Sequence, residues 1–235
     1  MHQLQDFPIT RRWPAKHPDR IQLYSFPTPN GVKASIMLEE TGLPYEAHLV
    51  NVLQGEAGTD AFLSLNPNRK IPAIIDPQGP GGKPIALFES GVILTYLAEK
   101  AGILLPADPA TRYETLQWLF FQSAHVSPSF SHFNWFHLFA GRAIEDKRPL
   151  DRFREDCIRL LGVLEQRLGG RRWIMGDDYT IADIQLFPWV IYARDDMRAQ
   201  DVLELDRFPR TLDWASRAAE RPASKKGRAV PAVPA

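Results

Sequence analysis

The sequence predicts an α/β unit followed by an all-α unit, and three observations carry that prediction. Up to residue 101, short apolar runs alternate with turns and helix-like segments in the order β-α-β and then β-β-α. After residue 110, apolar residues recur at three- and four-residue steps, which is typical of amphipathic helices. Residues 102–110 (GILLPADPA) break both patterns and are expected to form the linker.

Each element of the first unit has a local signal. Short strands are expected at 21–24, 45–52, 71–75 and 85–88. A helix is expected to begin after Asn30 and to end at Gly42, because glycine readily adopts the left-handed conformation that closes helices. A short turn or helix follows at 60–65, and Ser90 is expected to cap a helix that runs through Leu97. These elements predict a small mixed sheet with helices packed on it.

In the second unit, one long helix is predicted by a single apolar stripe made of Leu150, Phe153, Cys157, Leu160, Leu161, Leu164 and Leu168. Residues 180–183 (TIAD) have the form of a capping box that starts another, strongly apolar helix. Residues 1–20 and 223–235 lack periodicity and are expected to be extended arms.

Composition excludes several classes of protein. The 235 residues contain 28 Lys plus Arg and 28 Asp plus Glu, so the zero net charge argues against nucleic acid as a partner. One cysteine permits neither an internal disulfide nor a CxxC pair. Neither a secretory signal nor a membrane-length apolar run is found, so a cytoplasmic protein without a membrane partner is expected.

Two junctions in the first unit are unusual. Pro72 follows Ile71 within an apolar run, where proline is tolerated only at a strand's start or edge. If that bond is cis, the main chain of Ile71 faces solvent and can pair with an extended peptide. Ser90 and the first amides of its helix would form an anion site. Together these features suit a short anionic peptide, whereas the local alternative is a turn proline and an ordinary N-cap.

Several motifs resemble the glutathione transferase superfamily over about residues 20–222, in the expected order. They are TPNG at 28–31, LEE at 38–40, NPNRKIPAI at 66–74, FESGVI at 88–93 and the capping box at 180–183. TPNG in the first βα turn resembles the nu-class, disulfide-bond-reductase-like (Ure2-like) branch.

The resemblance implies the cytosolic glutathione transferase architecture and a homodimer. The expected parts are an N-terminal arm (1–20), a thioredoxin-like glutathione-binding domain (21–102), an all-α domain (110–222) and a C-terminal tail (223–235). Glutathione is the implied co-substrate. Ile71 would pair its backbone with the cysteinyl part of glutathione across a cis Pro72, and Glu89 and Ser90 would hold the γ-glutamyl amine and carboxylate. Lys70 would meet the glycyl carboxylate or remain a solvated surface lysine.

The resemblance also places Thr28 and Asn30 beside the glutathione sulfur, as catalytic residues. The nucleophile is a thiolate, and a thiol has a reference pKa of ~8.5. A hydroxyl donor and the amides at a helix N-terminus stabilise the thiolate and lower that pKa. Tyr24 is the rival hydroxyl, but it lies within a strand, where a role in the core is expected.

In the second unit, Gln117 and Arg152 match positions that approach glutathione or its disulfide, with a solvated helix face as the alternative. Where this branch has a glycine-rich segment after the helix that contains Gln117, the chain has residues 123–132, which contain no glycine. Aromatic residues follow, and they are expected either to line an apolar acceptor pocket or to form core. A glutamine expected in the 53–59 connector is Ala57 by position. These departures leave the second substrate open.

Metal and cysteine chemistry are not expected. His125, His132 and His137 lack the i, i+4 spacing of a helix-borne zinc site, so no metal is predicted. Cys157 lies on an apolar helix face, where cysteine behaves as a small hydrophobe.

The resulting hypothesis is a glutathione transferase or disulfide-bond reductase. Its bound glutathione thiolate would attack a disulfide, a peroxide or an electrophilic carbon. The sequence leaves open whether one glutathione, two glutathiones or their disulfide occupies the site. The alternative is a non-catalytic glutathione-transferase-like binding or regulatory protein, because fold does not imply function.

Overall fold

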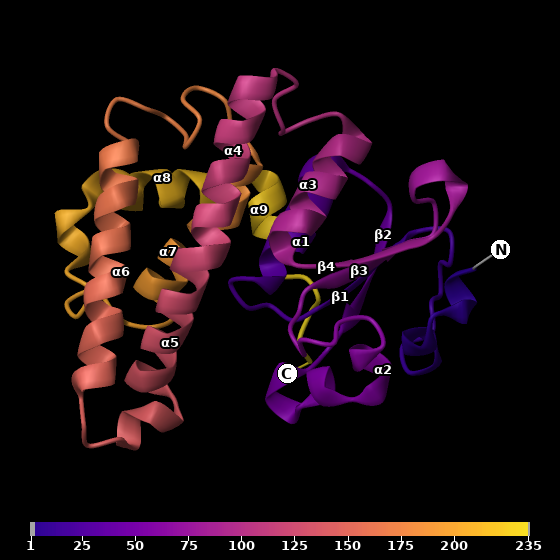
Figure 1. Ribbon diagram of the computed structural model, residues 1–235, viewed down its shortest axis with the longest axis horizontal. Helices are drawn as coiled ribbons and strands as arrows, with labels where there is room; N and C mark the ends of the chain where they lie inside the picture. The colour runs from indigo at the N-terminus through magenta and orange to yellow at the C-terminus, as the bar shows by residue number, and fades with distance from the viewer. Residues whose placement is uncertain (1–2, 235) are drawn as a thin grey trace. The chain divides into compact units, whose positions relative to one another are not determined.

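The computed structural model describes residues 3–234, which form two compact units (Figure 1). One unit contains the chain up to Ile103 together with the segment from Pro222 onward, and the other contains Leu104–Arg221. The first unit is α/β and the second is helical, which confirms the fold class expected from the sequence.

The first unit is built on a four-stranded mixed sheet in the order β2-β1-β3-β4. Its strands are β1 (Ile21–Ser25), β2 (Tyr45–Leu49), β3 (Ala73–Asp76) and β4 (Ile85–Phe88). β1 is parallel to β2, and β3 is antiparallel to β1 and to β4. Ala73 pairs with Tyr24 on one side and with Phe88 on the other. The last residues of β1 and β4 therefore lie at the same end of the sheet as the first residue of β3.

Three helices of this unit pack on the sheet, namely α1 (Gly31–Thr41), α2 (Asp60–Leu63) and α3 (Ser90–Ala101). α1 packs against α3 on one side of the sheet, and α2 lies on the other side (Figure 1). α1 ends at Gly42, whose φ of 66° is the left-handed conformation expected there. Further 3-10 turns are at Val52–Gln54, Glu56–Gly58 and Pro80–Gly82.

The N-terminal segment is not the extended arm that its composition predicts. It forms 3-10 turns at Leu4–Asp6 and Pro8–Arg11, and its apolar residues Leu4 and Ile9 are buried in the same core as α2. The indole of Trp13 donates a hydrogen bond to the Leu49 carbonyl, 3.0 Å away. The prediction of an extended arm is wrong because the apolar side chains of this segment, although they lack helical spacing, pack on one face of the sheet. Residues 1 and 2 lie outside the described residues.

The C-terminal segment also folds onto the first unit. α9 (Pro222–Gly227) packs against α1, and Ser35 Oγ donates to the Gly227 carbonyl at 2.7 Å. A Cβ at Gly227 would lie 2.5 Å from Ile36 Cα, so only glycine permits this approach. The expectation of an extended tail is therefore wrong for this helix; residue 235 lies outside the described range.

The second unit contains the helices α4 (Pro109–Phe121), α5 (Ser127–Leu138), α6 (Arg148–Arg167), α7 (Ile181–Asp195) and α8 (Pro209–Ala219), with a π-helical turn at Gln122–Val126 and 3-10 turns at Ala140–Ala143 and Leu205–Arg207. The expected capping box is present: Thr180 caps α7, and the Asp183 carboxylate accepts from the Thr180 amide. Within residues 3–234, no helix combines the length and apolar character needed to cross a membrane.

Candidate functional site

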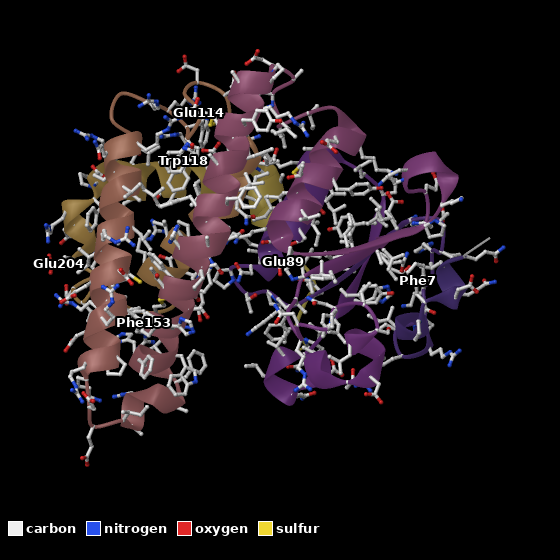
Figure 2. All side chains as sticks on the ribbon, in the orientation of Figure 1. Phe7, Glu89, Glu114, Trp118, Phe153 and Glu204 are labelled. Carbon is white, nitrogen blue, oxygen red and sulfur yellow. The ribbon has the colours of Figure 1, made fainter. Side chains whose placement is uncertain are left out.

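Three loop segments meet at one end of the sheet in the first unit. Residues 26–30 follow β1, residues 70–72 precede β3, and Glu89 follows β4 at the start of α3. Glu89 is labelled in Figure 2. The site residues expected in this unit fall in these three segments, except Ser90, which is the first residue of α3 and directly follows Glu89. The strand register thus brings together residues up to 62 positions apart, from Thr28 to Ser90.

The turn after β1 exposes a hydroxyl group. Thr28 is half-buried, and its amide donates to the Phe26 carbonyl at 2.7 Å. Its Oγ1 accepts from the Gly31 amide at 3.2 Å, and its carbonyl accepts from the Val32 amide at 3.0 Å. Because a hydroxyl carries one donor as well as its acceptors, Thr28 keeps an O–H to offer to an anion.

Gly31 lets this turn approach its neighbours closely. A Cβ at this position would lie 1.9 Å from the Phe26 carbonyl oxygen, 2.7 Å from Ser25 Oγ and 3.1 Å from Ile71 Cδ1. No side chain fits there. The first residue of α1 is thus held against the end of β1 and against the residue that precedes Pro72.

Asn30 occupies the N-cap position of α1, but its side chain does not cap the helix. Its Oδ1 instead accepts a hydrogen bond from Lys33 Nζ, 2.8 Å away. Lys33 is completely buried. Burial lowers the pKa of this lysine well below its usual range, and the attraction of Glu89 acts in the opposite direction.

No role for Lys33 is predicted from the sequence. One signal was available: Lys33 is the only charged residue in the run 31–38, all of which is buried.

The segment before β3 contains the expected cis bond. The Ile71–Pro72 peptide is cis, Pro72 is buried and Ile71 is half-buried. β3 begins at Ala73, so the main chain of Ile71 precedes the strand ladder. Lys70 is exposed, and its carbonyl accepts from Asn66 Nδ2 at 2.6 Å.

The junction between β4 and α3 differs by one residue from the expectation. Glu89, and not Ser90, is the N-cap, and Glu89 has a φ of 70° and a ψ of 113°. Ser90 is the first helical residue, so its amide is among those that point from the helix N-terminus. Glu89 is exposed, and its carbonyl accepts from the Ile93 amide at 3.0 Å. A carboxylate and a helix N-terminus therefore adjoin, a pair that suits an ammonium next to a carboxylate.

Tyr24, the rival hydroxyl, is buried in the core of the sheet. Its ring stacks on His48 with centroids 4.7 Å apart and meets Trp13 edge-on. Burial is the main cause that raises the pKa of Tyr24 above its usual range. These surroundings disfavour both proton release and contact with a bound thiol.

The second-unit candidates are both exposed. Gln117 lies on α4, and Arg152 lies on α6, where it forms an ion pair with Asp156 at 3.4 Å. No hydrogen bond or ion pair among residues 3–234 joins Gln117 to Arg152. Both remain predictions.

The histidines and the cysteine have ordinary surroundings. His132 packs on Phe153 with centroids 4.8 Å apart, and His137 stacks on Phe133 at 5.1 Å; Phe153 is labelled in Figure 2. No cluster of three or more His, Cys, Asp or Glu side chains that suits a metal occurs in the described part of the chain. Cys157 is fully buried, and burial raises the pKa of its thiol.

Comparison with known proteins gives the geometry a context. Residues 20–99 match the family model of the glutathione S-transferase N-terminal domain, and residues 149–217 match that of the C-terminal domain. The disulfide-bond oxidoreductase YghU of Escherichia coli is 40% identical over 223 residues, which covers 92% of this chain and 75% of that protein.

Two solved structures are similar over nearly their whole length. A glutathione transferase from Burkholderia graminis, with two glutathione molecules bound per subunit, is 55% identical with a TM-score of 0.97; the match covers 100% of this chain and 98% of that one. A glutathione transferase from Pseudomonas putida, with one glutathione disulfide bound per subunit, is 53% identical with a TM-score of 0.96 and covers 98% and 100%.

Proposed function

Because the chain belongs to the glutathione S-transferase family, we propose that it is a glutathione-dependent disulfide-bond oxidoreductase with transferase chemistry. The observation that carries the proposal is the meeting of the three loop segments at one end of the sheet. They supply a hydroxyl, a cis-proline edge and a carboxylate beside a helix N-terminus, which are the groups that a short anionic peptide requires.

Each end of glutathione has a chemical match in this unit. Glu89 would accept hydrogen bonds from the γ-glutamyl ammonium, and Ser90 with its neighbouring amides would bind the γ-glutamyl carboxylate. The main chain of Ile71 would pair with the cysteinyl residue beside Pro72. The exposed ammonium of Lys70 would meet the glycyl carboxylate, and Gln117 and Arg152 of the second unit are proposed to reach glutathione or its disulfide.

Thr28 and Asn30 are the proposed catalytic residues. Their side chains and the first amides of α1 would donate to the sulfur and lower the pKa of the thiol, so that more thiolate is present at neutral pH. The thiolate attacks one sulfur of a disulfide, a new S–S bond forms, and the other sulfur leaves as a thiolate. A second glutathione thiolate then attacks the mixed disulfide, which releases glutathione disulfide and the second reduced thiol. The two glutathiones, or the one glutathione disulfide, in the similar structures support this sequence.

Steady-state assays with two substrates test the function. Reduction of 2-hydroxyethyl disulfide by glutathione is expected to be faster than conjugation of glutathione to a chloro-nitrobenzene. Thr28→Ala is expected to lower kcat for disulfide reduction about 10–100-fold, and Thr59→Ala, at a half-buried threonine outside the three segments, is the matched control. Glutathione binding without turnover on either substrate would instead favour the non-catalytic alternative.

We further propose that the protein is a cytoplasmic homodimer. Large apolar side chains exposed on α4 support self-association, because Tyr113 and Phe120 are both 72% exposed. Sedimentation equilibrium is expected to give twice the chain mass of 26.7 kDa. A mass of one chain at micromolar concentration would contradict the dimer.

A further inference from the structure

The turn between α2 and β3, residues 66–70, contains an arginine in an unfavourable backbone conformation. Arg69 has a φ of 59°, which lies in the left-handed region. Residues with a Cβ are disfavoured there, whereas glycine adopts it freely and asparagine tolerates it. The turn alone therefore does not explain an arginine at this position. Strain of this kind is concentrated at functional sites, so Arg69 is a candidate for a functional role.

A buried asparagine holds this turn in place. Asn66 is 1% exposed. Its Oδ1 accepts from the Asn68 amide at 3.0 Å, and its Nδ2 donates to the Lys70 carbonyl at 2.6 Å. Its own carbonyl accepts from the Arg69 amide at 3.2 Å. The backbone on both sides of Arg69 is thus fixed by hydrogen bonds to one buried residue.

The turn carries two adjacent positive charges without a negative partner. Arg69 and Lys70 are the only charged residues between positions 61 and 75, and both are exposed. Neither side chain forms an ion pair or a hydrogen bond with another residue of the range 3–234. In the same unit, the ammonium of Lys100 is neutralised by Asp76 at 2.7 Å. The charges of the turn are therefore available to an anion from outside the chain.

The position of the turn brings these charges to the proposed site of disulfide attack. Residue 70 leads directly into Ile71 and Pro72, the edge proposed to pair with the cysteinyl residue of glutathione. Consecutive Cα atoms are ~3.8 Å apart, so the Cα atoms of Arg69 and Ile71 lie within about 8 Å of each other. Lys70 is already proposed to bind the glycyl carboxylate of glutathione. Arg69 is then the cation that remains for the disulfide.

We propose, on the basis of the proposed function, that Arg69 is a specificity-determining residue that favours disulfides bearing carboxylates over neutral disulfides. Its guanidinium donates two parallel hydrogen bonds to a carboxylate of the disulfide. Lys70 adds positive potential at the same edge, which raises the local concentration of an anionic substrate. The substrate class is an acidic thiol, such as glutathione or another acidic peptide, joined through its sulfur to a second thiol.

Two small disulfides of similar length test the proposal. 2-Hydroxyethyl disulfide is neutral, and 3,3′-dithiodipropionate carries two ionised carboxylates at neutral pH. Arg69→Gly is expected to lower kcat/KM for the dicarboxylate about 3–10-fold and to change that for the neutral disulfide less than about 1.5-fold. Each comparison uses one substrate, so the intrinsic reactivity of the disulfide cancels. The loss on the dicarboxylate is expected to shrink at about 0.5 M salt, because salt screens exposed charges.

Further variants separate the charge of Arg69 from its effect on the fold. Because glycine fits a positive φ, the Tm of Arg69→Gly is expected to be no more than about 2 °C below that of the wild type. If Arg69→Gly does not fold, Arg69→Asn takes its place, since asparagine also tolerates this conformation. Arg69→Lys keeps the charge and is expected to keep part of the preference for the dicarboxylate. Arg11→Gln removes an exposed cation outside the three loop segments and is expected to change neither activity.

The outcomes distinguish the specificity role from the proposed function. Equal losses on the two disulfides, or no loss on the dicarboxylate, would overturn the role of Arg69 and leave the proposed function intact. A raised KM for glutathione with an unchanged ratio between the two disulfides would overturn it as well, because Arg69 would then bind glutathione itself. A wild-type protein that reduces neither disulfide would overturn both.

Discussion

Replacing Asp183 by alanine removes the acceptor of four hydrogen bonds inside the second unit. Oδ1 accepts from the Ile174 amide at 2.9 Å and from Trp214 Nε1 at 2.8 Å. Oδ2 accepts from the Thr180 amide at 2.9 Å and from its hydroxyl at 3.3 Å. This carboxylate therefore ties the start of α7 to the loop before it and to α8.

The magnitude follows from the donors that lose their acceptor. Asp183 is fully buried, so water does not replace it at once. The hydroxyl of Thr180 can rotate to another acceptor, which leaves two amides and one indole N–H. Each unsatisfied buried donor costs about 1–3 kcal/mol, so the free energy of unfolding of this unit is expected to fall by roughly 3–9 kcal/mol. For a unit of this size, that is a drop in Tm of about 10–35 °C.

Differential scanning calorimetry of the intact protein measures the change. Asp213→Ala is the matched control, because this carboxylate is 70% exposed and pairs with Arg217 on the same helix surface. Its removal is expected to cost less than about 1 kcal/mol. Equal Tm shifts for the two variants, or a shift of only a few degrees for Asp183→Ala, would refute the claim that the buried Asp183 carboxylate stabilises the second unit by several kcal/mol.

Three other perturbations have definite expected results. Between pH about 4 and about 6, the calorimetric Tm of the wild type is expected to fall relative to that of Asp183→Asn as the pH rises. Burial raises the pKa of Asp183 to about 6, so over this range the folded state retains a proton that the unfolded chain releases. Parallel pH profiles of Tm for the two proteins would contradict this. Gly31→Ala places a Cβ 1.9 Å from the Phe26 oxygen. It is expected to lower the free energy of unfolding in urea by about 1–3 kcal/mol and to weaken glutathione binding in calorimetric titration. Glutathione binding as tight as that of the wild type would show that the turn can shift without loss of the site. Tyr24→Phe is expected to keep full activity in the disulfide assay, because the Tyr24 hydroxyl is buried without a hydrogen-bond partner among the described residues; a large loss would return Tyr24 to the catalytic candidates.

The sequence predicts the sheet and the main helices because their signals are local. β1 differs from its expected range by one residue, and β4 not at all. Gly42 ends α1 because the terminating conformation depends on that residue alone. Thr180 and Asp183 are similarly readable, because the capping box joins side chains three positions apart.

The features that the sequence does not predict depend on distant contacts. Leu4 and Ile9 have no helical period, and their burial depends on a sheet face assembled from residues far along the chain. The docking of α9 likewise depends on the approach of Gly227 to Ile36, residues separated by most of the chain. Lys33 was missed for the same reason, since a lysine is expected in water until the tertiary structure encloses it.

The N-cap of α3 shows where a local rule is overridden. A serine before an apolar helical run normally takes the N-cap, and the sequence predicts Ser90 there. The chain instead leaves β4 through Glu89 at positive φ, so the helix starts one residue earlier than that rule gives. Backbone strain of this kind at a non-glycine residue is typical of functional sites, and Glu89 is a proposed ligand of the γ-glutamyl group.

A crystal structure of the protein with bound glutathione tests the central claim most directly. We expect the sulfur within hydrogen-bond distance of Thr28 Oγ1 and Asn30 Nδ2, with the cysteinyl main chain paired to Ile71 and the γ-glutamyl carboxylate at the N-terminus of α3. Glutathione bound away from this end of the sheet, or a sulfur that faces neither Thr28 nor Asn30, would contradict it.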